Sequence, residues 1–206
     1  MHPDVAEAPD DQLGLRERKK AATRQALHEA AVRLAIAHGA EKVTVEAIAD
    51  AVEVSRRTFS NYFANKEEAL LYGDQVRMRH LLHLVRSQPA GTTPWAALTD
   101  SADELYRTLG NPNAEWISRN RLIHSHPALV AQQVATYALL ERDLATALAE
   151  RLDDAENPGL RARTMAAVFL AAMRVAVRLW LEQPAGAIAL PAMVQQTLAE
   201  AARPFA

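Results

Sequence analysis

Hydroxyl, guanidinium and amide side chains gather in one short segment of this chain of 206 residues. They belong to Ser55, Arg56, Arg57, Thr58, Ser60 and Asn61. A guanidinium fork can donate two parallel hydrogen bonds to guanine or to a phosphate, and hydroxyl or amide groups can reach base edges and phosphate oxygens. The segment therefore indicates contact with DNA, with base and phosphate left open for each side chain. The alternative is a solvated helix surface, where most charged residues lie.

Two short helices joined by a tight turn would present this segment. Thr44 can cap a helix over residues 45–51 and Ser55 can cap a helix over residues 56–62, because a hydroxyl in this position accepts a hydrogen bond from the first turn. A tight turn between two such helices is typical of a helix-turn-helix, which places its second helix in the major groove. The polar segment would then lie on the second helix, at the end that enters the groove.

Phosphate contacts are expected on either side of these two helices. Thr44 and Lys66 each stand at a helix N-terminus, where unpaired N–H groups and the helix dipole favour an anion. Thr44 can also act only as a cap, and Tyr62 can either donate to a phosphate or lie at the rim of a small core. A basic run precedes the two helices and can reach phosphates or the minor groove, or can be a solvated helix start; it consists of Arg16, Arg18, Lys19, Lys20 and Arg24.

Charge is distributed unevenly, although the formal net charge is only −2. Residues 1–12 contain four acids and no lysine or arginine, and we expect them to form a disordered acidic tail. Residues 13–66 contain ten lysines and arginines against six acids. The positive charge thus coincides with the helix-turn-helix, where attraction to phosphates requires it.

The remaining composition indicates a folded cytoplasmic protein. Half of the residues are hydrophobic, and a chain of this length can form one generous domain or two small ones. It has no cysteine, which excludes disulfides and thiolate metal sites and suits the cytoplasm. The longest apolar run, residues 165–173, is far shorter than the roughly 20 residues that cross a bilayer. The acidic N-terminus lacks the apolar stretch of a signal peptide.

Proline and glycine punctuate a chain in which strand-like alternation is nearly absent, and this predicts an all-α fold of about nine helices. Gly39 is suited to a left-handed cap at the end of the first helix, Asn65 can cap the fourth helix, and Asn111 with Pro112 is suited to begin the sixth. The expected helices cover residues 15–38, 45–51, 56–62, 66–86, 94–109, 112–124, 127–153, 158–183 and about 191–203.

These helices are expected to form two domains. Residues 13–66 would make a helix-turn-helix DNA-binding domain, and residues 67–206 a second, helical domain. A unit of the first domain's size can bury few large side chains, so those that it buries decide whether it folds. We expect its core to contain Leu34, Val45, Ile48, Phe59 and Phe63.

Residues 15–70 resemble the TetR family of bacterial transcriptional regulators. The resemblance rests on Gly39, the run of residues 44–49, Val54-Ser55, Thr58, Tyr62-Phe63, Lys66-Glu67 and Leu70. These residues keep the family's order and spacing, whereas residues 71–206 match it only in size and helix count. The resemblance implies that residues 67–206 form the helical domain for effector binding and dimerisation. Glu53 stands where the family usually has glycine in the turn, so we expect an uncomfortable backbone there.

The resemblance implies a regulator, in our interpretation a repressor, that binds a roughly palindromic operator in double-stranded DNA as a homodimer. The last two helices, about residues 158–203, would pair with those of a second subunit. Helix 158–183 is apolar on more than one face and needs such a cover. A small hydrophobic effector, such as an acyl thioester or an aromatic compound, would bind among the central helices, shift helix 66–86 and release the DNA.

The expected effector pocket is lined by Tyr106, Trp116, His124, Tyr137, Phe169 and Met173, each of which can instead be ordinary core. Arg119 and Arg121 beside Trp116 can receive an acidic group of the effector, or can remain solvated. Two rival interpretations stay open. One is an all-α small-molecule-binding protein or enzyme with an incidental helix-turn-helix, and the other is a regulator whose second domain only dimerises.

Enzyme and metal motifs are absent from the sequence. It contains no GxSxG, P-loop or GxGxxG motif, and the run from His28 to Val32 lacks the second histidine of a zinc-binding HExxH site. The histidine pairs 80 with 83 and 124 with 126 have no obvious carboxylate partners. We therefore expect no catalytic residue, no metal and no cofactor.

Overall fold

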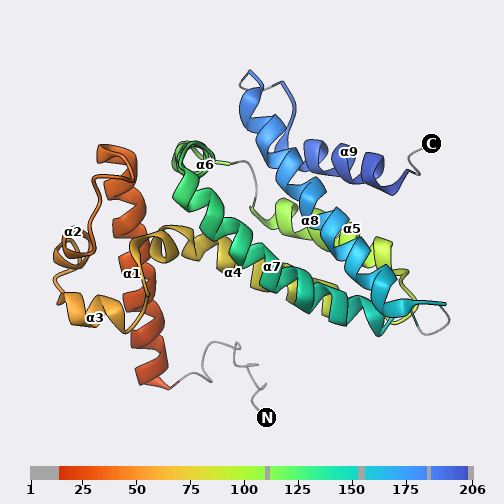
Figure 1. The fold of residues 1–206 in the computed structure, drawn as a ribbon, viewed down its shortest axis with the longest axis horizontal. Helices are drawn as coiled ribbons and strands as arrows, with labels where there is room; N and C mark the ends of the chain where they lie inside the picture. The colour runs from red at the N-terminus through yellow and green to blue at the C-terminus, as the bar shows by residue number, and fades with distance from the viewer. Residues whose placement is uncertain (1–13, 110–111, 153–155, 185–186, 204–206) are drawn as a thin grey trace, which may run out of the picture. The chain divides into compact units, whose positions relative to one another are not determined.

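The computed structural model describes residues 14–109, 112–152, 156–184 and 187–203, and within them the chain forms nine α-helices and no strand (Figure 1). The predicted all-α class is confirmed. The chain divides into two compact units, residues 1–70 and residues 71–206. The predicted acidic tail, residues 1–12, lies outside the described residues.

Three helices and the beginning of a fourth make up the first unit: α1 (Leu15–His38), α2 (Val45–Asp50), α3 (Arg56–Ser60) and α4 (Lys66–Ser87). The helices after α1 begin at predicted caps. Thr44 Oγ1 accepts a hydrogen bond from the first turn of α2 at 3.1 Å, and Ser55 Oγ accepts one from the first turn of α3 at 3.0 Å. Asn65 Oδ1 does the same for α4 at 2.7 Å. These caps give partners to N–H groups that a helix start otherwise leaves unpaired.

Aromatic and aliphatic side chains form the core of the first unit. Phe59 on α3 and Phe63 just after it are buried, with their ring centroids 5.7 Å apart, and Ile48 of α2 is fully buried as well. Leu34 and Val45, also expected in this core, are only half-buried. Further buried side chains are those of Leu27, Ala31, Val43 and Leu70.

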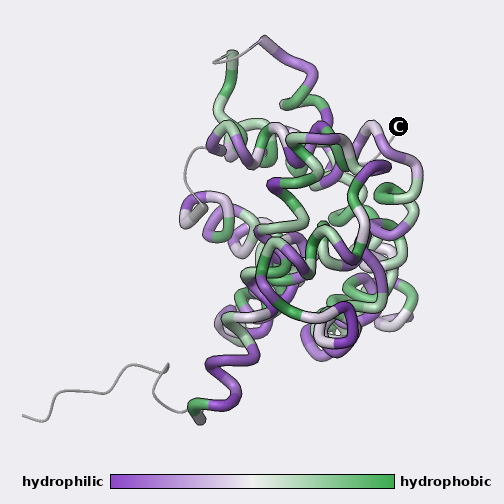
Figure 2. The backbone as a smooth tube through the Cα atoms, turned by 90° about the vertical axis from the view of Figure 1, so that its left-hand side faces the viewer, coloured by the Kyte–Doolittle hydropathy of each residue, from purple (hydrophilic) through white to green (hydrophobic). Residues whose placement is uncertain are grey.

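The rest of α4 and five further helices form the second unit: α5 (Pro94–Leu109), α6 (Ala114–Ser125), α7 (Pro127–Ala149), α8 (Pro158–Glu182) and α9 (Leu190–Ala202). Helices α7 and α9 both pack against α8, and α5 packs against α9. Hydrophobic and hydrophilic residues alternate along these helices (Figure 2), as expected for helices with one apolar side. The buried core includes Leu81, Leu98, Leu105, Leu144, Leu148, Phe169 and Leu198.

Three predicted helix ends differ from the structure by more than one residue: the end of α3, which is Ser60 and not residue 62, the start of α6 and the end of α7. Helix α6 begins at Ala114 because Asn113 Oδ1 caps it at 2.8 Å, while the predicted cap at residue 111 lies outside the described residues. Helix α7 ends at Ala149, short of residue 153, and just beyond it the Arg151 guanidinium donates to the Gln88 carbonyl at 2.7 Å. Gly39 ends α1 with φ +87° and ψ 142°, so its φ is positive as expected but its ψ is extended.

Helix α8 is, in the part of the chain that is described, the one helix long and apolar enough to cross a membrane. Its most apolar window has a mean hydropathy of 1.6, and 33% of that window is buried within this subunit. The core helix of a soluble protein meets the same criterion. Arg163, Arg174 and Arg178 stand within α8, and a charged side chain in the middle of a bilayer is costly.

Candidate nucleic-acid interface and buried pocket

The turn between α2 and α3 brings Ser55 to the start of α3. The Glu53 N–H donates to the Asp50 carbonyl at 3.0 Å, and the Val54 N–H donates to the Ala49 carbonyl at 3.0 Å. Glu53 has a φ of +57°, in the left-handed region, where a residue with a Cβ loses roughly 1–2 kcal/mol. The expected strain at Glu53 is confirmed.

Two guanidinium groups stand in the first turn of α3. Arg56 and Arg57 are exposed, and Arg56 Nη1 lies 3.0 Å from Glu46 Oε1 on α2. The two side chains of this ion pair are 73% and 54% exposed, and such surface pairs contribute at most about 1 kcal/mol, so a phosphate or base can displace the carboxylate. Among the described residues, no ion pair or hydrogen bond engages the Arg57 side chain. Arg57 is therefore available at once, whereas Arg56 must first leave Glu46.

The hydroxyl groups of α3 already have partners within the helix. The Ser55 and Thr58 hydroxyls lie 2.8 Å apart and share one hydrogen bond, and Ser60 Oγ donates to the Arg56 carbonyl at 3.2 Å. A hydroxyl oxygen has two lone pairs, so Thr58 and Ser60 can still accept from a base or a water molecule, whereas Ser55 already accepts from the Thr58 N–H and has at most one lone pair left. Asn61, at the C-terminal end of α3, is exposed. The structure thus brings all these predicted residues onto one short helix and its two ends.

Lys66 has a different environment from the one expected of a phosphate clamp. Its Nζ donates to the carbonyl of Ala40 at 2.9 Å, to that of Val43 at 2.8 Å and to that of Glu41 at 3.3 Å. An ammonium group has three N–H donors, so these three contacts occupy all of them. The Lys66 ammonium therefore ties the α1–α2 connection to the start of α4, and only the backbone N–H groups remain for the predicted phosphate contact.

The basic run at the start of α1 divides into structural and exposed members. The half-buried Arg24 donates from Nη2 to the Tyr62 carbonyl at 3.1 Å, and its guanidinium lies 5.7 Å from the centre of the Phe63 ring. Arg24 therefore supports the turn after α3. Further toward the N-terminus, an open groove of about 680 Å³ is lined by Leu15, Arg16, Glu17, Lys19, Lys20, Thr23, Asn61 and Tyr62.

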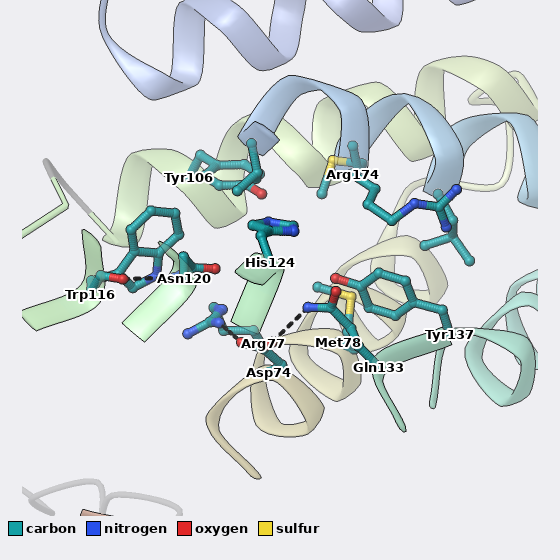
Figure 3. A pocket seen from close by; sticks show the side chains of 13 residues that line it. Asp74, Arg77, Met78, Tyr106, Trp116, Asn120, His124, Gln133, Tyr137 and Arg174 are labelled. Atoms are coloured by element: carbon teal, nitrogen blue, oxygen red, sulfur yellow. Dashed lines mark hydrogen bonds and ion pairs between the residues drawn. The ribbon is translucent and has the colours of Figure 1, made fainter. Parts of the chain in front are cut away.

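A small cavity lies inside the second unit, among α4, α5, α6, α7 and α8 (Figure 3). Its wall contains Asp74, Arg77, Met78, Tyr106, Trp116, Asn120, His124, Gln133, Tyr137, Leu170, Met173, Arg174 and Val177. Five of the six residues expected to line an effector pocket are among them. The sixth, Phe169, is not: it is fully buried in the core, with its ring edge-on to Trp95 at 6.5 Å. The cavity measures about 30 Å³, which is room for about two water molecules.

A buried cluster of charged and polar groups forms one side of this cavity. The carboxylate of Asp74 on α4 pairs with the guanidinium of Arg77 one turn later and with Arg119 Nη2 of α6 at 3.0 Å. Its second oxygen accepts from Gln133 Nε2 of α7 at 3.1 Å. Asp74 was not predicted from the sequence. Its position on the apolar side of α4, three residues after Leu71, was the feature that could have identified it.

Burial sets the protonation states around the cavity. Desolvation raises the pKa of Tyr106 and of Tyr137 to about 12, so both phenols are neutral donors near neutral pH. Desolvation also lowers the pKa of Arg77 and of Arg119 to about 10, which leaves both guanidinium groups charged there. The pKa of His124 is lowered by burial first, and then by guanidinium groups of α8.

A second, larger hollow lies next to this cavity. It measures about 390 Å³ and is lined by Pro112, Ile117, Arg121, Trp180, Leu181, Gln183, Pro184, Ile188, Ala189 and Leu190. The ring of Trp116, which lines the small cavity, meets the ring of Trp180, which lines this hollow, edge-on at 6.0 Å. Trp180 Nε1 donates to the Ile188 carbonyl at 2.8 Å. The two tryptophans therefore form a shared wall, and Arg121 faces the hollow while Arg119 belongs to the buried cluster.

Two family models match the chain. The model described as "Bacterial regulatory proteins, tetR family" matches residues 27–72, and the one described as "MftR C-terminal domain" matches residues 92–206. A curated relative, the HTH-type transcriptional regulator TcmR of Streptomyces glaucescens, is 34% identical over 173 residues, which cover 81% of this chain and 76% of the relative.

Solved structures of similar fold include two with a bound small molecule. FadR of Thermus thermophilus, a TetR-family repressor in complex with lauroyl-CoA, matches with a TM-score of 0.58 and 23% identity, over 86% of this chain and 92% of that one. The complex of SmeT with triclosan matches with a TM-score of 0.58 and 19% identity, over 87% and 91%. At these identities the two structures show a common fold.

Proposed function

The chain belongs to the TetR family of bacterial regulatory proteins, and from this premise we propose that it is a repressor that leaves its operator when a small molecule binds. Its helix-turn-helix makes it a DNA-binding regulator of transcription. The observation that carries the proposal is the pair Arg56 and Arg57, both exposed in the first turn of α3 behind the Ser55 cap. Repression at an operator would place the protein with the DNA, in the cytoplasm.

We assign base readout to the start of α3. Arg57 and Arg56 would meet base edges in the major groove, because arginine on guanine is the commonest specific contact. The DNA backbone would run along the open groove at the start of α1, where Arg16, Lys19 and Lys20 supply positive charge. The remaining contacts are assigned to Thr44, Ser55, Thr58, Ser60, Asn61 and Tyr62, whose side chains are exposed or half-buried.

The dimer interface is assigned to α8 and α9. Val168, Ala171, Val175 and Leu179 follow one another along α8 at helical spacing and are half-buried or exposed, so this subunit leaves an apolar stripe uncovered. On α9 the exposed Ala199 is small enough to let another helix approach closely. Two-fold symmetry would set two copies of α3 about one DNA turn apart, which suits a roughly palindromic operator.

The effector site is assigned to the small cavity and its surroundings. The complexes of FadR with lauroyl-CoA and of SmeT with triclosan support an apolar effector for a protein of this fold. Small-molecule sites usually measure roughly 300–1,000 Å³, whereas this cavity measures about 30 Å³. The described conformation is therefore a closed one, and binding must open it. A ligand that binds only the open form stabilises that form at the expense of the other.

DNA binding tests the proposal most directly. The full-length protein should retard DNA from its own upstream region at nanomolar concentration, and its affinity should fall steeply as salt rises. Changing both Arg56 and Arg57 to alanine should weaken the complex by about 100-fold or more, since each base contact is worth roughly 1–3 kcal/mol. Gel retardation with a shuffled sequence as competitor measures both affinity and specificity.

The matched control removes the same charge elsewhere. Arg86 on α4 and Arg142 on α7 are exposed and lie outside both candidate sites and the proposed dimer interface, so their double alanine variant should bind DNA like the unmodified protein. If the Arg56 and Arg57 variant keeps full affinity and specificity, α3 is not the recognition helix. If DNA is bound but no compound releases it, the second unit only dimerises.

A further inference from the structure

We infer that the effector of this protein carries an acidic group, and that this group replaces the Asp74 carboxylate as the partner of Arg77 and Arg119. The inference rests on the proposed function of the second unit as an effector site, and it names the chemical class of the effector. Its evidence is the balance of charge and of hydrogen-bond donors around the small cavity.

The buried cluster has more positive than negative charge. The Asp74 side chain is 5% exposed and pairs with two guanidinium groups, of which that of Arg119 is 7% exposed and that of Arg77 is 19% exposed. Arg174 of α8 also lines the cavity, but its side chain is exposed, so the excess charge within the cluster is that of Arg77 and Arg119 over Asp74. The exposed Glu115, one turn before Arg119, is the other carboxylate whose charge acts on Arg119. A buried charge without a full counter-charge is unfavourable, so a second anion at this place would be stabilised.

Three hydrogen-bond donors in and beside the cavity have no acceptor among the described residues. Arg119 Nε is buried without a hydrogen-bond partner. Within the described residues, no hydrogen bond is formed by the hydroxyl of Tyr106 or of Tyr137, and both phenols line the cavity. Gln133 already donates to Asp74. Carboxylate oxygens accept several hydrogen bonds at once and make stronger ones than neutral acceptors do, so an acid fits these donors better than an amine or an alcohol.

The rest of the cavity wall indicates that the acid belongs to an apolar molecule. Met78, Leu170, Met173 and Val177 line it with aliphatic and thioether groups, and Trp116 closes it toward the larger hollow. Displacement of the tryptophan wall would join the cavity of about 30 Å³ to the hollow of about 390 Å³. The acidic end would then lie at the guanidinium cluster and the apolar body would extend toward the hollow.

Replacement of the Asp74 carboxylate by that of the effector would weaken the contacts that hold α4. Asp74 belongs to α4, while Arg119 belongs to α6 and Gln133 to α7, so these two contacts hold α4 to both helices. An acid that takes over Arg119 would leave Asp74 without this partner and would loosen α4. Helix α4 also contains Lys66, which ties it to the α1–α2 connection of the DNA-binding unit. The acid would thus loosen α4, the helix that contributes residues to both units.

Matched acids and amides test the inference. Benzoate, 2-naphthoate and decanoate are compared with their amides for binding to the full-length protein, by quenching of tryptophan fluorescence and by thermal shift. At least one acid should bind about tenfold or more tightly than its amide, because the two molecules share a shape and differ in charge. Asp74→Asn should bind that acid about tenfold more tightly still, since the competing carboxylate is gone.

A triple variant separates the charge effect from loss of folding. Asp74→Asn combined with Arg77→Met and Arg119→Met leaves no charged group of this trio, so it should still unfold cooperatively in the thermal shift and should lose the preference for the acid over its amide. If every amide binds as tightly as its acid, in the unmodified protein and in Asp74→Asn alike, the inference is overturned. It is also overturned if no acid binds to Asp74→Asn.

The same samples separate this result from failure of the proposed function. Release of upstream DNA is followed by fluorescence anisotropy with each compound. Release by a neutral amide as efficient as release by its acid would leave the regulator intact and refute the acidic class. An acid that binds to a protein without affinity for DNA would instead refute the proposed function and leave the acid preference standing.

Discussion

Arg119 Nη2 on α6 lies 3.0 Å from Asp74 Oδ1 on α4, and both side chains are more than nine-tenths buried, at 7% and 5% exposure. A buried carboxylate held by two guanidinium groups cannot lose its charge or its partners without leaving an uncompensated ion in the core. Through Arg119 and Gln133, Asp74 holds α4 against both α6 and α7.

Removal of the Asp74 carboxylate should therefore be costly. Asp74→Ala is expected to lower the free energy of unfolding by about 3–5 kcal/mol, because it leaves two buried guanidinium groups without their counter-charge. Urea unfolding followed by circular dichroism measures the change. Glu104→Ala, which breaks the exposed pair with Arg107, should cost at most about 1 kcal/mol. Equal effects of the two variants would contradict a structural role of the buried cluster.

Glycine at position 53 should stabilise the turn between α2 and α3. Glu53→Gly is expected to stabilise the protein by about 1 kcal/mol, because glycine adopts the φ of +57° without steric cost. Ala51, with φ −64°, is the matched control two residues earlier, and Ala51→Gly should destabilise by roughly 0.5–1 kcal/mol. The midpoint of urea unfolding, measured for both variants, gives the change in stability of each. A glycine at position 53 that destabilises as much as one at position 51 would show that the turn is not strained.

Lys66 and Lys20 should affect DNA binding in different ways. Lys66→Met removes the hydrogen bonds to the Ala40 and Val43 carbonyls, so it should lower the free energy of unfolding by about 1–3 kcal/mol. The slope of log affinity against log salt should stay the same, because the ammonium is not on a phosphate. Lys20→Ala should leave stability within about 0.5 kcal/mol and reduce that slope by about 1. A reduced slope for the Lys66 variant would show instead that the Lys66 ammonium contacts a phosphate.

Interactions between residues near one another in sequence account for what could be predicted. The caps at Thr44, Ser55 and Asn65 depend on a side chain and the helix turn beside it, so residue types alone located them. The end of α7 was harder to predict, because Arg151 just beyond it donates to the carbonyl of Gln88, which is distant in sequence. That contact exists only once α4 and α7 are packed.

The buried cluster could not be predicted for the same reason. Asp74 meets Gln133 across 59 positions of sequence, and nothing in either local pattern indicates the other. Phe169 and Leu170 show how fine the distinction is, since one helical step of about 100° places Phe169 in the core and Leu170 on the cavity wall. Aromatic residue types could identify the pocket as a region, but they could not decide which neighbour faces it.

The uncovered side of α8 leads to a prediction about oligomeric state. Leu179→Glu should convert the dimer to monomer at micromolar concentration, because it buries a charge in the proposed apolar interface. Leu139→Glu on α7 changes a side chain that is 60% exposed, against 43% for Leu179, and should leave the dimer intact. Sedimentation velocity distinguishes the two states. A dimer that survives the change at Leu179 and dissociates with the change at Leu139 would move the interface to α7.

Acid should weaken the second unit through His124. Because the pKa of this imidazole is lowered in the folded state, the unfolded chain binds more protons as the pH falls below about 6.5, and stability decreases through that range. The charged groups that act on the imidazole are Arg174, Arg178 and Glu182, and the same cavity is lined by Asp74 and Arg77. His124→Gln should remove this part of the pH dependence.

The expected effect is small because the imidazole is only half-buried and solvent screens its charge. The unmodified protein should lose slightly more free energy of unfolding than His124→Gln when unfolding is compared at pH 7.5 and pH 5.5. An anion bound in the cavity would favour the protonated imidazole, so the same comparison with 2-naphthoate present should shrink or reverse the difference. A His124 variant that loses more stability in acid than the unmodified protein would show that the imidazole is charged in the folded state.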